Sequence, residues 1–228
     1  GMAECCLAIS FSPLYAGHST DWIDGDYLAS EEYALPLELS DDPGRAAGFV
    51  KCGTPLPGYE VEIRDHDGKP VEKRHTGTIH VRGPSVMTGY YNAPEETAAT
   101  LSGDGWLNTG DIGYQVDDQL VITGRHKDLI IINGRNIWPQ DLEYVAEHQP
   151  ETRSGDAVAF SVTTDKEQEL CVLVVQSRAT ETVAKNALIK RLITQVRLEY
   201  GIDCYVELVA PRSLPRTSSG KLSRAKAR

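Results

Sequence analysis

The chain has 228 residues, which is enough for one large domain or two smaller ones. It is 40% hydrophobic and 25% charged, with a formal net charge of −10 at pH 7, which argues against a general nucleic-acid-binding surface. No apolar run approaches the ~18 residues that a membrane-spanning helix needs. The five cysteines have no C-x-x-C or zinc-type spacing, so we expect reduced thiols and a cytoplasmic location.

Residues 1–124 have the pattern of short strands joined by turns. Three segments with alternating or continuous apolar residues are predicted strands: 60–64, 78–82 and 119–122. Residues 94–99 predict one or two helical turns, because a proline comes early and acidic residues follow it. Residues 10–52 are the hardest part of the chain to assign.

From residue 125 onward, predicted strands alternate with predicted helices. The strands are expected at 129–132, 157–162, 170–175 and 205–209. A helix should begin at Pro139, and residues 182–199 form an amphipathic helix with an apolar residue every fourth position. That stripe consists of Ala184, Leu188, Leu192 and Val196. We therefore expect a mixed α+β fold, with a β-rich part over 1–124 followed by a small α+β domain over 125–228.

Four segments carry most of the chemical information. In chain order they are 1–4 (GMAE), 106–111 (WLNTGD), 123–136 (TGRHKDLIIINGRN) and 214–222 (LPRTSSGKL). The last is a loop rich in Pro, Ser and Gly that contains Lys221. A lysine on such a loop can carry a positive charge to a phosphate and withdraw it. Taken alone, the same segment is also typical of a frayed basic chain end.

Together the four segments resemble the adenylate-forming superfamily, which includes acyl-CoA synthetases, peptide-synthetase adenylation domains and luciferases. The match to fatty acyl-AMP ligases is closer still. The resemblance spans the chain, which corresponds to the C-terminal part of such an enzyme. It implies that residues 1–124 end the large adenylation domain and that 125–228 form the small mobile domain. An insertion within residues 10–52 also fits fatty acyl-AMP ligases.

The resemblance implies ATP and AMP as nucleotides, with magnesium as the metal. Lys221 would be the catalytic cation that bridges the substrate carboxylate and the α-phosphate, where negative charge gathers. Glu4 would hold magnesium, which prefers oxygen ligands, and Gly1, Met2 and Ala3 would contribute to the nucleotide site. Without the other motifs, Glu4 is more typical of a solvated acid near a chain end.

Asp111 and Arg125 are the expected ribose ligands. A carboxylate can accept both ribose hydroxyls, and a planar guanidinium suits ribose and phosphate oxygens. The alternatives are a surface turn for the Thr-Gly-Asp motif and a surface ion pair for Arg125. Lys127 occupies the family's hinge position, where the backbone would absorb the rotation between adenylation and thioester formation.

Gly134, Arg135 and Asn136 are expected to line the path of the acceptor thiol. CoA-forming members of the family usually have Gly-Gly-Glu-Asn or a similar sequence there. The Arg-Asn pair followed by Trp-Pro-Gln-Asp is what fatty acyl-AMP ligases show. Sequence drift at a surface turn is the alternative.

We therefore expect the full-length parent to activate a medium- or long-chain fatty acid as acyl-AMP and to pass it to an acyl carrier protein. A basic patch such as Arg212, Arg216 and Arg224 is a candidate docking surface for that carrier. One alternative is an acyl-CoA synthetase that uses free CoA. An alternative of another class is an inactive fragment that serves as a carrier-docking or regulatory module. The fragment alone should not complete the reaction. Neither the histidine spacing nor the basic residues indicate a second metal site or a nucleic-acid partner.

Overall fold

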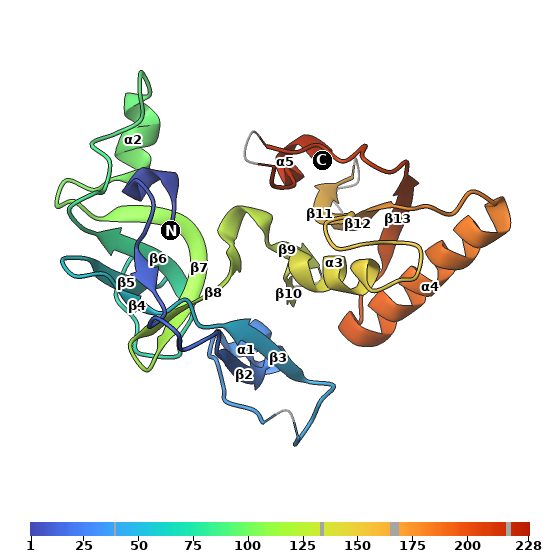
Figure 1. Ribbon diagram of the computed structural model, residues 1–228, viewed down its shortest axis with the longest axis horizontal. Coiled ribbons are helices and arrows are strands. Elements are labelled where there is room, and N and C mark those ends of the chain that lie inside the picture. The colour runs from blue at the N-terminus through green and yellow to red at the C-terminus, as the bar shows by residue number, and fades with distance from the viewer. Residues whose placement is uncertain (39, 133–134, 165–168, 218–219) are drawn as a thin grey trace. The chain divides into compact units, whose positions relative to one another are not determined.

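The computed structural model describes residues 1–38, 40–132, 135–164, 169–217 and 220–228. It divides into two compact units, Gly1–Lys127 and Asp128–Arg228, which we describe separately (Figure 1). Both contain helices and small sheets, so the predicted mixed α+β class is confirmed. No helix within the described ranges is long and apolar enough to cross a membrane.

The first unit is built on an antiparallel sheet in the order β5-β6-β7-β8. Its strands are β5 (Glu60–Arg64), β6 (Gly77–Arg82), β7 (Leu107–Val116) and β8 (Gln119–Arg125). Asp117 and Asp118 close the β7–β8 hairpin, and their positive φ values of 50° and 59° match the twist that a two-residue hairpin turn requires. The sequence predicts the other three strands but not β7, because the glycines inside it are turn signals.

Two apolar clusters cover opposite faces of this sheet. The neighbours Leu120 and Val121 belong to different clusters, as expected where side chains alternate across a strand. One cluster joins the sheet to the N-terminal segment through Cys5, Ile9, Ile63, Ile79, Val81, Leu107 and Leu120. Around this face lie η1 (Ala3–Cys5), the short pair β1 (Ser10–Phe11) and β4 (Thr54–Pro55), and α2 (Pro94–Thr100).

Residues 20–50 form a small structure on the other face of the sheet. Strand β2 (Thr20–Asp24) pairs antiparallel with β3 (Ala46–Val50), and α1 (Gly25–Glu31) begins directly after β2. Asp24 caps α1 by accepting a hydrogen bond from the Tyr27 amide at 3.0 Å. The cluster that joins this structure to the sheet consists of Ile23, Leu28, Ala34, Tyr114, Val116 and Val121.

A buried carboxylate anchors this small structure to β7. Asp21 is 7% exposed and accepts hydrogen bonds from the Tyr114 hydroxyl at 2.8 Å and from both terminal nitrogens of Arg74 at 3.1 and 3.2 Å. Burial, reinforced by the bond to Asp21, raises the pKa of Tyr114, so the phenol stays protonated and donates. A buried carboxylate without such donors would be strongly destabilising.

The second unit contains a three-stranded sheet with two helices against one face. Strand β11 (Ala157–Thr163) pairs antiparallel with β12 (Glu169–Gln176), and β12 pairs parallel with β13 (Cys204–Val209). Helix α4 (Thr182–Tyr200) makes the crossover that parallel pairing needs, and α3 (Pro139–Glu147) packs in the same core (Figure 1).

The core of the second unit confirms the predicted helix stripe. Leu188, Leu192 and Val196 are fully buried, whereas Ala184 is part-exposed at the start of the helix. Cys171 and Cys204 are core residues, as expected, and all five cysteines are free thiols. Burial raises the pKa of Cys171 to about 12, which keeps that thiol protonated.

The last residues of the chain cover the opposite face of this sheet. Leu214 is buried with Val158 and Phe160 of β11, and Leu222 and Ala227 pack against the same cluster. Helix α5 (Arg224–Ala227) ends the chain, while β9 (Ile130–Ile132) and β10 (Arg135–Ile137) form a separate hairpin at the start of the unit. The loop that carries Lys221 is therefore held by apolar packing on both sides.

Candidate functional site

Asp111 and Arg125, the two expected ribose ligands, face each other across β7 and β8. Their Cα atoms are register partners, and Arg125 Nε donates to Asp111 Oδ1 at 2.6 Å. The Asp111 side chain is 20% exposed and the Arg125 side chain 59%, so the pair is accessible from solvent. The structure thus brings together two residues that are 14 positions apart in the sequence.

The residues before Asp111 fix its place in β7. Asn108 Oδ1 accepts the Gly110 amide at 2.9 Å, and Thr109 Oγ1 donates to the Ile79 carbonyl at 2.8 Å while accepting the Asp111 amide at 3.1 Å. Gly110 has a φ of +70°, a conformation that favours glycine. The pairing of β7 shifts register against β6 between Asn108 and Ile112, and against β8 directly after Ile112. Such bulges re-aim side chains beside functional sites. The motif is therefore a bulged strand segment and not a surface turn.

Glu4 lies in η1 and is half-buried. Its Oε1 accepts a hydrogen bond from the Tyr90 hydroxyl at 3.0 Å, and its backbone carbonyl accepts the Met87 amide at 2.7 Å. Burial, followed by the bond to Glu4, raises the pKa of Tyr90, so the phenol remains a donor. The described residues form no cluster of three or more side chains able to ligate a metal. A single carboxylate still fits magnesium, which at nucleotide sites binds one or two carboxylates together with phosphates and water.

Gly1 and Met2 lead into η1 in the same unit, and Ala3 is its first residue. A Cβ at Gly1 would lie 1.8 Å from the Leu7 carbonyl oxygen, so only glycine fits this close backbone approach. Met2 is half-buried against the first apolar cluster, and Ala3 is exposed. Their contribution to a nucleotide site stays a prediction.

Lys221 lies in a tight turn of the second unit and is exposed. Arg216 and Leu222 form an antiparallel bridge around it, and the Thr217 amide donates to the Lys221 carbonyl at 2.8 Å. The Lys221 amide donates to Thr217 Oγ1 at 3.2 Å, and Gly220 has a φ of +83°. Hydrogen bonds between Thr217 and Lys221 thus hold the described ends of this segment together, and Lys221 is exposed. This arrangement differs from a frayed chain end. It suits a flexible lysine side chain whose backbone position is set by hydrogen bonds.

Lys127 lies in the short 3-10 helix η2 (His126–Asp128), and the division between the two compact units falls directly after it. The next residue is held by an ion network inside the second unit. Arg224 donates to Asp128 at 2.9 Å and to both oxygens of Glu143 at 2.7 and 3.1 Å. Burial raises the pKa of Glu143, and the charge of Arg224 works against that shift. A hinge motion at Lys127 stays a prediction.

Arg135 belongs to β10, where it pairs with Ile132, and its side chain is exposed. The guanidinium lies beside the end of α4, since a Cβ at Gly201 would come within 2.8 Å of one of its nitrogens. A cation is favourable at that position because it faces the negative end of the helix dipole. Asn136 is part-buried in the same hairpin. Gly134, the third expected acceptor residue, lies outside the described residues.

The expected site residues therefore divide between the two units. Glu4, Asp111 and Arg125 belong to the first, and Arg135 and Lys221 belong to the second. Sequence reasoning missed Tyr90, which contacts Glu4, and the network in which Arg224 joins Glu143 to Asp128, the residue after Lys127. The only local signal for Tyr90 is an aromatic pair after Gly89.

Comparisons with known proteins place this geometry in a family. The profile of the AMP-binding enzyme family matches residues 1–91. A chain from a structural study of fatty acyl-adenylate ligases of E. coli and L. pneumophila superposes with a TM-score of 0.90 at 42% identity, covering 100% of this chain and 40% of that one. The chain belongs to the adenylate-forming superfamily.

Two curated relatives bear on the reaction. A Caulobacter vibrioides protein with the provisional name acyl-CoA synthetase is 46% identical over 229 residues, which is 100% of this chain and 40% of that protein. The medium-chain-fatty-acid–[acyl-carrier-protein] ligase JamA of Moorena producens is 37% identical over 190 residues, or 78% of this chain and 32% of JamA. The chain thus spans about two fifths of the first of these relatives.

Proposed function

We propose that the full-length protein containing this chain is a fatty acyl-AMP ligase. The observation that carries the proposal is the exposed Lys221, whose backbone is hydrogen-bonded to Thr217, in a chain similar to fatty acyl-adenylate ligases. The paired Asp111 and Arg125 support it independently, since a carboxylate beside a guanidinium is a suitable receptor for the two hydroxyls of a ribose.

In the proposed reaction a carboxylate oxygen of the fatty acid attacks the α-phosphorus of ATP. The bond from that phosphorus to the bridging oxygen breaks, and pyrophosphate leaves with the electron pair. Lys221 offsets the negative charge that gathers between the carboxylate and the α-phosphate. Magnesium, when bound, would neutralise phosphate charge, and Glu4 would hold it with Tyr90 orienting the carboxylate.

We further propose that the acyl group passes to the phosphopantetheine thiol of an acyl carrier protein. The thiol sulfur attacks the acyl carbon, AMP leaves, and the thiol proton goes to solvent. Support comes from the similarity to JamA and from Arg135 in a position where CoA-forming enzymes usually have a smaller or acidic residue. A carrier protein adds docking energy that free CoA lacks.

An acyl-CoA synthetase is the second candidate, because the Caulobacter relative carries that name. The two are separated by giving the full-length enzyme ATP, a fatty acid and either saturating CoA or a holo carrier protein. The ligase predicts acyl-AMP formation and faster transfer to the carrier than to CoA. Acyl-CoA release equal to or faster than acyl-carrier formation would instead establish the synthetase. Absence of acyl-AMP with every acid tested would contradict both.

A further inference from the structure

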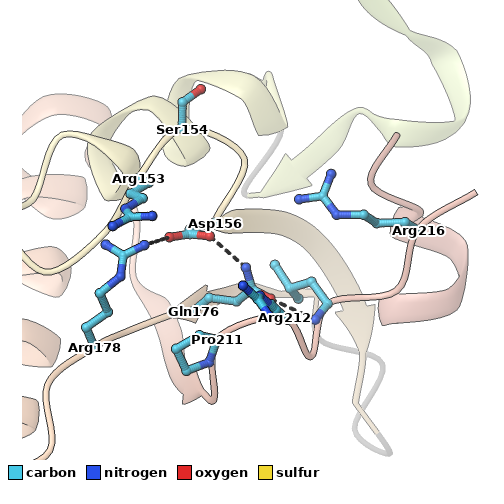
Figure 2. A pocket seen from close by; sticks show the side chains of 9 residues that line it. Arg153, Ser154, Asp156, Gln176, Arg178, Pro211, Arg212 and Arg216 are labelled. Carbon is cyan, nitrogen blue, oxygen red and sulfur yellow. Dashed lines mark hydrogen bonds and ion pairs between the residues drawn. The ribbon is translucent and has the colours of Figure 1, made fainter. Parts of the chain in front are cut away.

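A cleft of about 800 Å³ opens in the second unit beside the base of the Lys221 turn (Figure 2). Its lining comes from three separate stretches of the chain, 153–156, 176–178 and 211–216. The charged or amide side chains are Arg153, Asp156, Gln176, Arg178, Arg212 and Arg216. None of the nucleotide, metal, hinge or acceptor-channel assignments above uses this cleft, although Arg212 and Arg216 also belong to the suggested carrier-docking patch.

The cleft is strongly basic, although the chain is acidic. It contains four guanidinium groups and one carboxylate, whereas the whole chain has a net charge of −10. Asp156 accepts hydrogen bonds from Gln176 at 2.7 Å and from Arg178 at 3.4 Å. Among the described residues, no side chain pairs with the guanidinium of Arg153 or Arg212. Positive charge therefore exceeds negative charge in the lining by three.

Hydrogen bonds hold the floor of the cleft together. Gln176 is only 4% exposed, its Nε2 donates to Asp156, and its Oε1 accepts the Leu214 amide at 3.0 Å. Asp156 also accepts the Gln176 amide through its backbone carbonyl at 2.7 Å. Figure 2 shows Asp156 held between Gln176 and Arg178 by these contacts. Arg212 has a φ of +67°, a left-handed conformation that non-glycine residues seldom adopt outside constrained or functional positions.

One arginine of the cleft is also part of the Lys221 turn. Arg216 donates to the Gly155 carbonyl at 3.1 Å and to the Gly220 carbonyl at 2.8 Å. Gly155 lies between the cleft residues Ser154 and Asp156 in the sequence. A ligand that takes a hydrogen bond from Arg216 would compete with the carbonyl next to Lys221. The position of that turn should therefore depend on whether the cleft is occupied.

We propose that this cleft is a phosphate-binding site that is coupled to the Lys221 turn through Arg216. Guanidinium groups match phosphate oxygens with paired hydrogen bonds, and several of them in one concave site suit a compact anion with many oxygens. The ligand chemistry is a phosphate or diphosphate group. It could be supplied by free pyrophosphate or by the phosphates of a nucleotide-containing thiol such as CoA. An effect of the coupling on catalysis rests on the proposed role of Lys221. Phosphate binding in the cleft does not depend on that role.

The binding is tested on the 228-residue chain by titration calorimetry at low salt with inorganic pyrophosphate and, separately, with CoA. We expect saturable binding that weakens as salt is added. The Arg153→Gln/Arg212→Gln variant should bind about tenfold more weakly, because two exposed charge contacts of up to about 0.7 kcal/mol each are lost. Arg197→Gln is the matched control, since Arg197 is an exposed α4 arginine that pairs with Asp203 outside the cleft.

The outcomes separate the sources of the phosphate. Preference for CoA over pyrophosphate, or the reverse, supports the site and identifies its ligand. A third arm uses an acidic peptide without phosphate, and tighter binding of that peptide than of either phosphate ligand would overturn the proposal in favour of a protein-docking surface. No saturable binding of either phosphate ligand up to about 10 mM, or equal binding by the double variant, would also overturn it.

The coupling is tested by amide hydrogen exchange, which does not depend on catalysis. The Gly220 amide donates to the Thr217 carbonyl and the Lys221 amide to Thr217 Oγ1, so exchange at these two amides reports on the turn. Pyrophosphate should change their exchange in the wild-type chain and less in Arg216→Lys, which keeps the charge but not the fork of donors. Unchanged exchange in the wild type at saturating ligand would reject the coupling while leaving the proposed ligase activity untouched.

Discussion

Asp111 and Arg125 form an ion pair, in which the Arg125 Nε lies 2.6 Å from Asp111 Oδ1. The two residues are register partners in neighbouring strands. The guanidinium orients the carboxylate, and the bulged segment before Asp111 fixes the backbone from which it extends. A nucleoside that binds here would meet both groups at once. Substitution of either residue should therefore weaken nucleotide binding more than it changes the fold.

Asp111→Asn in a full-length enzyme should raise the KM for ATP by roughly 10- to 100-fold, since a charged hydrogen-bond acceptor of the ribose is lost. Steady-state kinetics at varied ATP measure this. Asp118→Asn is the control, because Asp118 is an exposed carboxylate at the tip of the same hairpin and pairs with Lys73. A KM for ATP within about twofold of wild type in Asp111→Asn would remove this residue from the nucleotide site.

Arg224→Gln should lower the free energy of unfolding of the second unit by about 1–3 kcal/mol. The reason is that Asp128 and Glu143, whose side chains are only 23% and 13% exposed, would lose their shared cation. Urea denaturation of the 228-residue chain measures the change. Arg197→Gln, which removes a more exposed ion pair with Asp203, should change stability by less than about 0.5 kcal/mol. Equal losses in the free energy of unfolding for the two substitutions would show that the Arg224 network stabilises the fold no more than an exposed ion pair does.

Asp141→Asn tests the pH dependence of stability. Burial, with a smaller effect from Glu143, raises the pKa of Asp141 from 3.8 to about 6. The folded state therefore prefers the protonated carboxyl, so its contribution to stability is present below pH 4 and is lost as pH rises through 6. At pH 8 the ionised group costs about 3 kcal/mol at most, of which its position in the first turn of α3 offsets up to about 1 kcal/mol.

The asparagine variant should thus have a higher Tm than wild type at pH 8 and a similar Tm at pH 4. Thermal denaturation followed by circular dichroism at the two pH values measures the difference. A lower Tm of the variant at pH 8 would mean that the ionised Asp141 stabilises the fold as a helix N-terminal acid.

Tyr114→Phe should destabilise the first unit by about 1–2 kcal/mol and make residues 20–50 more sensitive to protease. The substitution removes the hydroxyl that donates to buried Asp21 at 2.8 Å and leaves the ring in place. Tyr205→Phe is the control, since its hydroxyl donates to Glu207 on an exposed part of β13. Unchanged cleavage within 20–50 in Tyr114→Phe would show that the Tyr114 hydroxyl does not help to anchor the segment.

Local patterns predict much of the fold but not the contacts that build the site. Glu60–Arg64 alternates cleanly and is a strand with the predicted bounds, and the apolar stripe of α4 predicts its buried face. The sequence does not predict strand β7, because Gly110 and Gly113 resemble turn residues. In the structure, Gly110 adopts a positive φ within the bulged segment. Gly113 is needed because the Val121 backbone carbonyl approaches it closely.

Partners that are distant in sequence cannot be predicted from periodicity. Tyr90 contacts Glu4 across 86 positions, and Arg224 contacts Glu143 across 81. The suggested patch of Arg212, Arg216 and Arg224 is only partly a surface feature. The first two line the basic cleft, whereas Arg224 is committed to Asp128 and Glu143.

Fatty-acid-dependent ATP–pyrophosphate exchange by the full-length enzyme tests the central claim most directly, because it reports adenylation alone. We compare Lys221→Ala with Lys226→Ala, a nearby exposed lysine in α5. The account predicts that Lys221→Ala lowers exchange by about 10²- to 10³-fold, as expected when a transition-state cation is lost, and that Lys226→Ala changes it by less than about threefold. Exchange by Lys221→Ala within about threefold of wild type would contradict the account.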